Sequence, residues 1–345
     1  MTSVGVTAQS AIVARNDSGL VLRSAPMTSV SIYGVGQLGT AVARLLAANQ
    51  RMRVTGPHGR SERDVALTGG ADVVVIATTT RLLDVAADVE LAVSHGSNVL
   101  VSAEEAAFPF MVDESTAARI DALARANGVS VAGVGVNPGL IFDALVLTML
   151  GAAPRECRID VRRVVDISGF GATVLRRIGL GRTEPDFRAA VERGDILGHA
   201  GFPQSMMIVA NAIGLTIERI DKVLKPVVTP VDIDVPGRFR IAAGESAGVD
   251  QFYTSIVGGN PWFSAHFYGH VDLASLDLER TDDIDLVVDG VPFQSVHLRP
   301  GIGAQVGSQN MTANSIDRIV AARPGWVTVA ELAPAFPAAF MRPSD

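Results

Sequence analysis

The fold is decided by the segment Val30-Ser31-Ile32-Tyr33-Gly34-Val35-Gly36-Gln37-Leu38-Gly39-Thr40-Ala41-Val42-Ala43-Arg44-Leu45-Leu46. It predicts a buried strand, then a G-x-G-x-x-G turn, then a helix. The first glycine makes the tight turn, the second admits a pyrophosphate, and the third lets helix and strand pack closely. An ordinary glycine-rich turn is the alternative. The placement between strand and helix favours dinucleotide binding, with these residues as ligands: Gly34, Gly36, Gln37, Leu38 and Gly39.

Composition limits the class of protein. The chain has 345 residues, which suggests about two domains, and it is 48% hydrophobic and 19% charged, as in a folded globular protein. The net charge of −7 argues against nucleic acid as the main partner. Cys157 is the single cysteine, so no intrachain disulfide forms and a reducing cytoplasm fits. No apolar stretch reaches the ~18 residues that would span a bilayer.

The first half of the chain predicts a doubly wound α/β sheet of the Rossmann type over residues 27–150. Further strand patterns follow at 51–55, 72–77, 98–101 and 129–133, and helical patterns at 81–94 and 113–127. The run Met1-Thr2-Ser3-Val4 recurs as Met27-Thr28-Ser29-Val30, directly before the first strand. Residues 1–26 are therefore expected to be a tail or an added edge strand, and translation beginning at Met27 is the alternative.

The second half changes rhythm after Asn137-Pro138-Gly139. Helical patterns cover 140–150, 184–193 and 203–213, and a strand pattern covers 157–165. Residues 230–299 alternate polar and apolar, which predicts an antiparallel sheet. We therefore expect a second α+β domain over 151–308, and a C-terminal segment 309–345 whose helix, at 309–322, packs back on the first domain.

The predicted second strand ends in a basic loop. No carboxylate is placed where an NAD-type fold would hold the ribose 2′-hydroxyl, whereas Arg60, Ser61 and Arg63 follow the strand. Arginine and serine donors suit a 2′-phosphate, so the sequence predicts NADP over NAD. A solvated basic loop is the alternative.

Polar residues follow three strands at the edge where ligands bind in open α/β sheets. Thr78 and Thr79 suit the cofactor's ribose or diphosphate, and Asn137 suits the nicotinamide amide or the substrate. Glu104 and Glu105 follow another strand, and a carboxylate among apolar residues there would titrate near neutral pH. The alternatives are a simple turn at Asn137 and, for the glutamates, negative charges that stabilise the N-terminus of a helix.

Two histidines stand in aromatic or glycine-rich contexts, His199 and His266, and a core or loop imidazole is the alternative for each. No spacing suggests a metal site, since there is no second cysteine and no H-x-x-x-H. No G-x-S-x-G supports a serine nucleophile.

Four motifs together resemble 2,4-diaminopentanoate dehydrogenases and the native amine dehydrogenases related to them, whose N-terminal domain is similar to dihydrodipicolinate reductase. They are the glycine motif, Ala77-Thr78-Thr79, Glu104-Glu105-Ala106-Ala107-Phe108-Pro109 and Gly135-Val136-Asn137-Pro138-Gly139. The likeness covers about residues 28–335. It implies a homodimer that reduces an imine, formed from a carbonyl compound and ammonia, with a nicotinamide cofactor.

The resemblance also assigns roles to residues. Glu104 matches the family's catalytic glutamate, with Glu105 as the fallback. The substrate pocket is matched to four residues: Asn137, Phe142, His199 and His266.

The stretch 162–170 is more apolar than the family pattern, and Phe142, Trp262 and Phe263 add aromatic lining. We therefore expect a simple aliphatic or cyclic amine or ketone rather than a diamino acid. The alternatives are a 2,4-diaminopentanoate dehydrogenase, an imine or dihydrodipicolinate-type reductase, and a non-catalytic NADP sensor.

Overall fold

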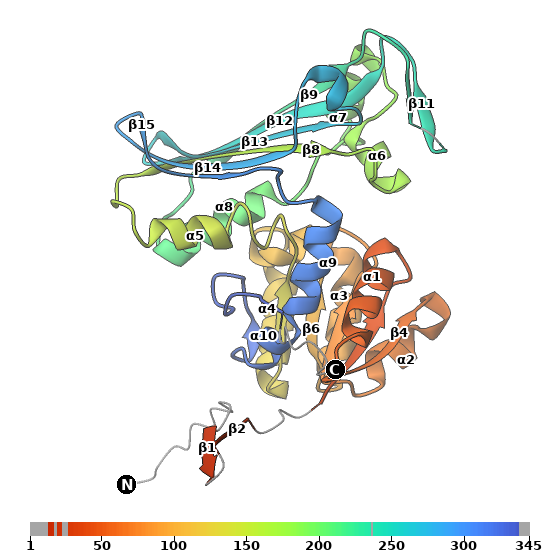
Figure 1. Ribbon diagram of the computed structural model, residues 1–345, viewed down its shortest axis with the longest axis vertical. Helices are drawn as coiled ribbons and strands as arrows, with labels where there is room; N and C mark the ends of the chain where they lie inside the picture. The colour runs from red at the N-terminus through yellow and green to blue at the C-terminus, as the bar shows by residue number, and fades with distance from the viewer. Residues whose placement is uncertain (1–12, 17–18, 23–26, 236, 338–345) are drawn as a thin grey trace.

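A parallel sheet of six strands forms the first domain of the computed structural model, which describes residues 13–16, 19–22, 27–235 and 237–337 (Figure 1). The strand order is β4-β3-β5-β6-β7-β16. Their bounds are β3 (Thr28–Tyr33), β4 (Met52–His58), β5 (Val73–Ile76), β6 (Asn98–Val101), β7 (Ser130–Gly133) and β16 (Gly325–Trp326). This architecture confirms the predicted doubly wound α/β fold.

The strands are apolar on both faces because helices cover both faces. In β5, Val73 and Val75 join the core beneath α1 (Gln37–Ala47) and α10 (Ile316–Val320). Val74 and Ile76 join the core beneath α2 (Arg63–Thr68) and α3 (Leu82–Ser94), where α4 (Glu114–Asn127) also packs. Because successive side chains of β5 point to opposite faces of the sheet, the strand contributes to two separate cores.

The strand order creates a crevice at one point of this sheet. β3 lies between β4 and β5, so the chain runs outward in opposite directions from it. The loops that follow β3 and β5 diverge there, and ligands of open α/β sheets bind at such a point. The glycine motif follows β3, and Thr78 and Thr79 follow β5.

A second sheet of six strands lies above the first domain (Figure 1), in the order β15-β14-β8-β13-β12-β9. The bounds are β8 (Arg158–Asp166), β9 (Arg219–Val228), β12 (Ser246–Val257), β13 (Asn260–His270), β14 (Thr281–Val288) and β15 (Val291–Leu298). The expected antiparallel sheet is in fact mixed, because β8 and β13 run parallel. A short hairpin, β10 (Ile233–Val235) and β11 (Phe239–Ile241), stands apart from it.

Helices α5 (Ala144–Leu150) and α8 (Phe202–Ile213) lie between the second sheet and the first domain (Figure 1). They share one apolar core with the inner face of the sheet. Helix α7 (Glu184–Glu192) matches a predicted helix, whereas α6 (Ala172–Ile178) was not predicted. No described helix has the length and apolarity to cross a membrane.

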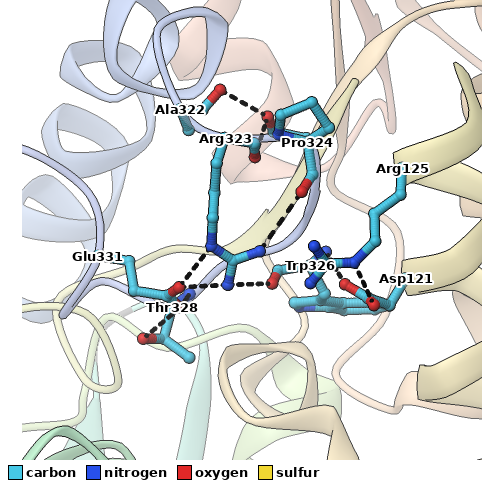
Figure 2. A network of polar contacts seen from close by, with 9 residues as sticks. Asp121, Arg125, Ala322, Arg323, Pro324, Trp326, Thr328 and Glu331 are labelled. Carbon is cyan, nitrogen blue, oxygen red and sulfur yellow. Dashed lines mark hydrogen bonds and ion pairs between the residues drawn. The ribbon is translucent and has the colours of Figure 1, made fainter. Parts of the chain in front are cut away.

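The chain end returns to the first domain as two helices and a strand rather than one helix. α9 (Ala304–Asn314) and α10 meet at Ser315, and β16 then pairs with β7. Figure 2 shows how this end is fastened: the Trp326 amide donates to Asp121 Oδ1 at 2.7 Å, and Arg323 Nε donates to Glu331 Oε1 at 2.8 Å.

At the other end, β1 (Val13–Asn16) and β2 (Gly19–Leu22) pair with each other and with no other described strand. The rest of the expected tail, residues 1–12, 17–18 and 23–26, and residues 338–345 of the C-terminal segment lie outside the described residues.

Candidate active site

The three motif glycines have three different environments. A Cβ at Gly34, whose φ is +131°, would lie 2.3 Å from the Ala77 carbonyl oxygen. A Cβ at Gly39 would lie 2.0 Å from the Gly34 oxygen, so this glycine allows α1 to pack on β3. A Cβ at Gly36 would meet nothing within 4 Å. The open space at Gly36, at the N-terminus of α1, is the feature that a pyrophosphate requires.

A cleft of about 360 Å³ begins at this turn and runs between the two domains. Its walls come from the ends of β3, β5, β6 and β7, from α6 and from α9. Among the residues that line it are Gly36, Gln37, Leu38, Thr78, Thr79, Glu104, Asn137, Phe170, Val174, Arg177, His199 and Ser308. The structure thus brings eight of the sixteen sequence-predicted site residues to the wall of one cleft.

The structure separates the roles of the two adjacent glutamates. Both lie in the short turn η2 (Glu104–Ala107) that follows β6. Glu105 Oε2 accepts a hydrogen bond from the Leu82 amide at 2.7 Å, so Glu105 caps the N-terminus of α3. Glu104 lines the cleft instead, and its Oε2 is buried without a hydrogen-bond partner in the described chain. Burial raises the pKa of Glu104, which Arg177 opposes.

The η2 turn is held from three sides. A Cβ at Gly133 in β7 would lie 2.3 Å from the Ala107 nitrogen, so β7 and the turn are in backbone contact. A Cβ at Gly201, just before α8, would lie 2.5 Å from Pro138 Cδ and 3.4 Å from Glu104 Cβ. From the chain end, Trp326 Nε1 donates to the Ala106 carbonyl at 3.1 Å. These contacts fix the position of the backbone that carries the Glu104 side chain.

Arg177 is a site residue that sequence reasoning missed. It lies on α6, and its Nη2 is 3.5 Å from Glu104 Oε1. Its Nη1 donates to Thr80 Oγ1, in the loop that follows β5. The segment 169–181 is rich in glycine and holds the short helix α6, so no periodicity marked it.

His199 faces the cleft as a neutral imidazole. Burial, together with the nearby arginines Arg163 and Arg177, lowers its pKa from 6.5 to about 3. Its backbone is fixed by Gln251, which accepts from the His199 amide at 2.8 Å and donates to its carbonyl at 3.1 Å. The ring packs 4.7 Å from the Phe267 ring, between centroids. A neutral ring at this place can orient a polar ligand but carries no charge.

Asn137 is another buried polar side chain in the cleft. It is 7% exposed, and both its Oδ1 and Nδ2 lack a partner among the described residues. The Asn137–Pro138 peptide is cis. Below it, Asp143 accepts from the Gly139 amide at 2.8 Å and from Ser205 Oγ at 2.7 Å, which fastens this loop to α8.

The cleft concentrates unpaired polar atoms. Ten buried side-chain nitrogen and oxygen atoms lack a partner in the described part of the chain, and five of them belong to cleft residues. These five are Glu104 Oε2, Asn137 Oδ1 and Nδ2, Arg177 Nε, and His199 Nδ1. Buried polar groups are normally hydrogen-bonded, so this concentration indicates a site built for a polar ligand.

The basic loop after β4 lies beside the glycine turn, since a Cβ at Gly59 would be 3.9 Å from Val35 Cγ1. Arg60 and Ser61 are exposed. Arg63 is already paired, with its Nε 2.6 Å from Asp88 Oδ1. Glu62, in the same loop, accepts from the Gly59 amide at 3.2 Å.

Two predicted pocket residues do not line the cleft. Phe142 is fully buried in the second-domain core, with its ring 4.9 Å from that of Phe202. His266 lies on the outer face of the second sheet, where its Nε2 is 2.6 Å from Asp250 Oδ1 and its ring stacks on Phe252 at 4.0 Å. In β13 the residue that faces inward toward His199 is the neighbouring Phe267, because successive side chains point to opposite faces.

The apolar stretch 162–170 also lies mostly elsewhere. Val165 and Ile167 belong to the core, as does Phe263, and Trp262 is buried with them. Only Phe170 of that stretch lines the cleft. The described chain holds no group of three or more histidine, cysteine or acidic side chains arranged for a metal ion.

Comparison with known proteins gives three findings. Residues 140–344 match the family model of the 2,4-diaminopentanoate dehydrogenase C-terminal domain. A 2,4-diaminopentanoate dehydrogenase of Acetoanaerobium sticklandii is 31% identical over 329 residues, covering 88% of this chain and 92% of the relative. The solved amine dehydrogenase of Mycobacterium smegmatis matches with a TM-score of 0.78 at 19% identity, covering 90% of this chain and 97% of that one, which shows a shared fold.

Proposed function

Since the chain belongs to the 2,4-diaminopentanoate dehydrogenase family, we propose that it is a nicotinamide-dependent amine dehydrogenase. It acts on CH–NH₂ donors. In one direction it aminates a ketone or aldehyde reductively with ammonia, and in the other it deaminates a primary amine oxidatively. The observation that carries this proposal for the site is the set of unpaired buried polar atoms around Glu104, beyond the open glycine turn.

The residues of the cleft fit a dinucleotide. The space at Gly36 accommodates a pyrophosphate, the amides of Gln37 and Leu38 at the start of α1 face it, and Thr78 and Thr79 lie across the crevice. When bound, the reduced nicotinamide supplies the hydride that turns an iminium carbon into an amine carbon. The unpaired amide of Asn137 is placed to hold either the cofactor's carboxamide or the substrate.

Glu104 is the group we assign to proton transfer. As a carboxylate it takes a proton from ammonium, so that ammonia can attack the carbonyl carbon. As an acid it returns that proton to the carbinolamine hydroxyl, which leaves as water. The regenerated carboxylate then faces the iminium cation, and in a water-poor cleft this attraction is stronger than in bulk solvent.

We assign NADP as the preferred cofactor. Arg60 and Ser61 are exposed beside the glycine turn and offer donors for a 2′-phosphate. Arg63 contributes less than the sequence predicts, because it is paired with Asp88. Arg60→Ala should raise the KM for NADPH and leave that for NADH unchanged. An unchanged KM for NADPH would refute the assignment.

We propose a simple carbonyl compound, or the matching amine, as substrate. The cleft wall includes Phe170, Val174 and Val136, which suit an aliphatic or cyclic skeleton. Val165 and Ile167 belong to the core and do not line the cleft. A substrate panel should therefore contain 2,4-diaminopentanoate as well as simple ketones and aldehydes.

The test of the whole proposal is NADPH oxidation with this panel, with and without ammonia. An amine dehydrogenase makes no amine from a ketone unless ammonia is present, whereas an imine reductase needs a preformed imine. A non-catalytic sensor binds NADPH without turnover. Glu104→Gln keeps the shape and removes the charge, so kcat should fall ~10²- to 10⁴-fold. Near-normal amination by Glu104→Gln would exclude the role of this residue.

We also propose a homodimer that uses the outer face of the second sheet. One row across that face contains Val223, Phe252 and His266, aligned by the strand register. Val223 is 47% exposed and Phe252 38%. Light scattering should give twice the chain mass, and Phe252→Asp should shift it toward the monomer.

A further inference from the structure

We propose that Arg177 is a positioning residue, which reaches from the second domain to keep Glu104 as an oriented carboxylate in the cleft. The inference rests on the proposed role of Glu104 and extends it to a residue that no motif marked. The charge and orientation of Glu104 then depend on the contact between the two domains.

The side chain of Arg177 contacts two residues of the first domain. Arg177 Nη2 lies 3.5 Å from Glu104 Oε1, and Nη1 donates to Thr80 Oγ1. Glu104 and Thr80 follow neighbouring strands, β6 and β5, whereas Arg177 belongs to α6 of the second domain. The Arg177 and Glu104 side chains are 19% and 20% exposed, so the pair is partly shielded from water.

Arg177 keeps capacity for a ligand. Its Nε is buried without a partner among the described residues, as is the second carboxylate oxygen of Glu104. A pair formed only for stability would be expected to use these donors and acceptors in a bidentate arrangement. The offset contact instead leaves Glu104 Oε2 buried and without a partner among the described residues.

The helix that carries Arg177 is fixed at both ends. Before it, Arg238 of the β10–β11 hairpin donates to the carbonyl of Ser168 and, at 2.5 Å, to that of Phe170. After it, Gly179 has a φ of +93°, and a Cβ there would lie 2.6 Å from Phe187 and Ile196. The guanidinium is therefore held over the cleft by a short, anchored helix.

The electrostatic consequence follows from the groups around Glu104. Burial and the neighbouring Glu105 raise the pKa of Glu104, and Arg177 is the cation that lowers it. His199, which also lines the cleft, is neutral because its pKa is about 3. Arg163 is paired with Asp282 and acts on His199 rather than on Glu104. Removing Arg177 thus leaves only the backbone hydrogen bond of Glu104 to oppose the cost of burying its charge.

The experiment is the pH profile of kcat/KM for amine deamination at saturating NADP, in Arg177→Met and Arg177→Lys. The Met variant removes the charge and keeps most of the volume. Its acidic limb should move up by ~1–2 pH units, which is a ~10- to 100-fold loss of rate below the limb. The Lys variant should keep most of the wild-type profile. Thr80→Val, which removes a neutral partner, should leave the limb in place.

Two further measurements separate the possible failures. In a Glu104→Gln background, Arg177→Met should cause no further shift of the acidic limb. The infrared band of the protonated Glu104 carboxyl should be absent from this double variant. A limb that stays in place in Arg177→Met, with a circular dichroism spectrum like wild type, overturns the inference. So does a change confined to the KM for NADP, which makes Arg177 a cofactor contact. Full activity in Glu104→Gln instead refutes the proposed function.

Discussion

A glycine-to-alanine substitution, which adds one methyl group, can distinguish the motif glycine needed for cofactor binding from the one needed for folding. In Gly36→Ala the new Cβ enters open space, and the backbone φ of −71° suits alanine. Alanine reduces the entropy of the unfolded chain by ~0.4–1 kcal/mol, and it is a poorer helix cap than glycine by a similar amount. The free energy of unfolding of the apoprotein should therefore change by less than ~1 kcal/mol.

NADPH binding should respond very differently to Gly36→Ala. The methyl group occupies the space that we assign to the pyrophosphate, and overpacking of this kind costs ~1–3 kcal/mol. At 1.4 kcal/mol for each tenfold change, the Kd for NADPH should rise roughly 5- to 140-fold. Titration by calorimetry, beside thermal unfolding of the same samples, measures both effects.

The matched variant is Gly39→Ala. Its Cβ would lie 2.0 Å from the Gly34 carbonyl oxygen, so the clash is within the protein itself. This variant should lose ~3 kcal/mol or more of folding stability, with its cofactor affinity affected only through that loss. If Gly36→Ala binds NADPH as tightly as wild type, the dinucleotide does not approach the backbone at this turn, and the reasoning is refuted.

Three further predictions follow from polar contacts. Glu105→Ala should destabilise the fold by ~1 kcal/mol, because it leaves the Leu82 amide at the start of α3 without its cap, while kcat changes little; a large loss of kcat would contradict the capping role. Trp326→Phe should cost ~1–3 kcal/mol in chemical denaturation, since it leaves a buried carbonyl of the η2 turn unpaired, and should lower kcat more than it raises KM. The hydrogen bond from Ser29 lowers the pKa of Asp72, so this bond stabilises the fold above the unfolded-state pKa of Asp72, and the stabilisation is lost as pH falls. Ser29→Ala should therefore reduce the melting temperature more at pH 7 than at pH 3. An equal loss at both pH values would refute this.

The first domain was largely predictable because its signals are local. The all-apolar strand at 73–76 and the helix from 114 to 127, closed by Gly128 with a φ of +69°, lie within a residue or two of their predicted bounds. The Glu104 turn was marked by a motif with a resemblance to a known family. Sequence reasoning could not divide the two glutamates, because their roles depend on which one reaches the amide of Leu82.

The second domain was harder because its site residues depend on tertiary packing. The alternation in β13 predicts that His266 and Phe267 face opposite sides, but it does not state which side is inward. That is decided by the helices α5 and α8, which cover one face only. Arg177 was missed for a similar reason, since its partners Glu104 and Thr80 come from the other domain.

The first domain is closed by residues from the far end of the chain. Its first strand begins at Thr28, but one of its two edge strands is β16, and Trp326 then fastens the turn that carries Glu104. During synthesis, a nascent chain that stops short of β16 would present the bare edge of β7, which is a template for pairing with other chains. The turn that carries Glu104 is thus complete only when translation has passed residue 326. A truncated chain that ends earlier should aggregate and should show no partial activity.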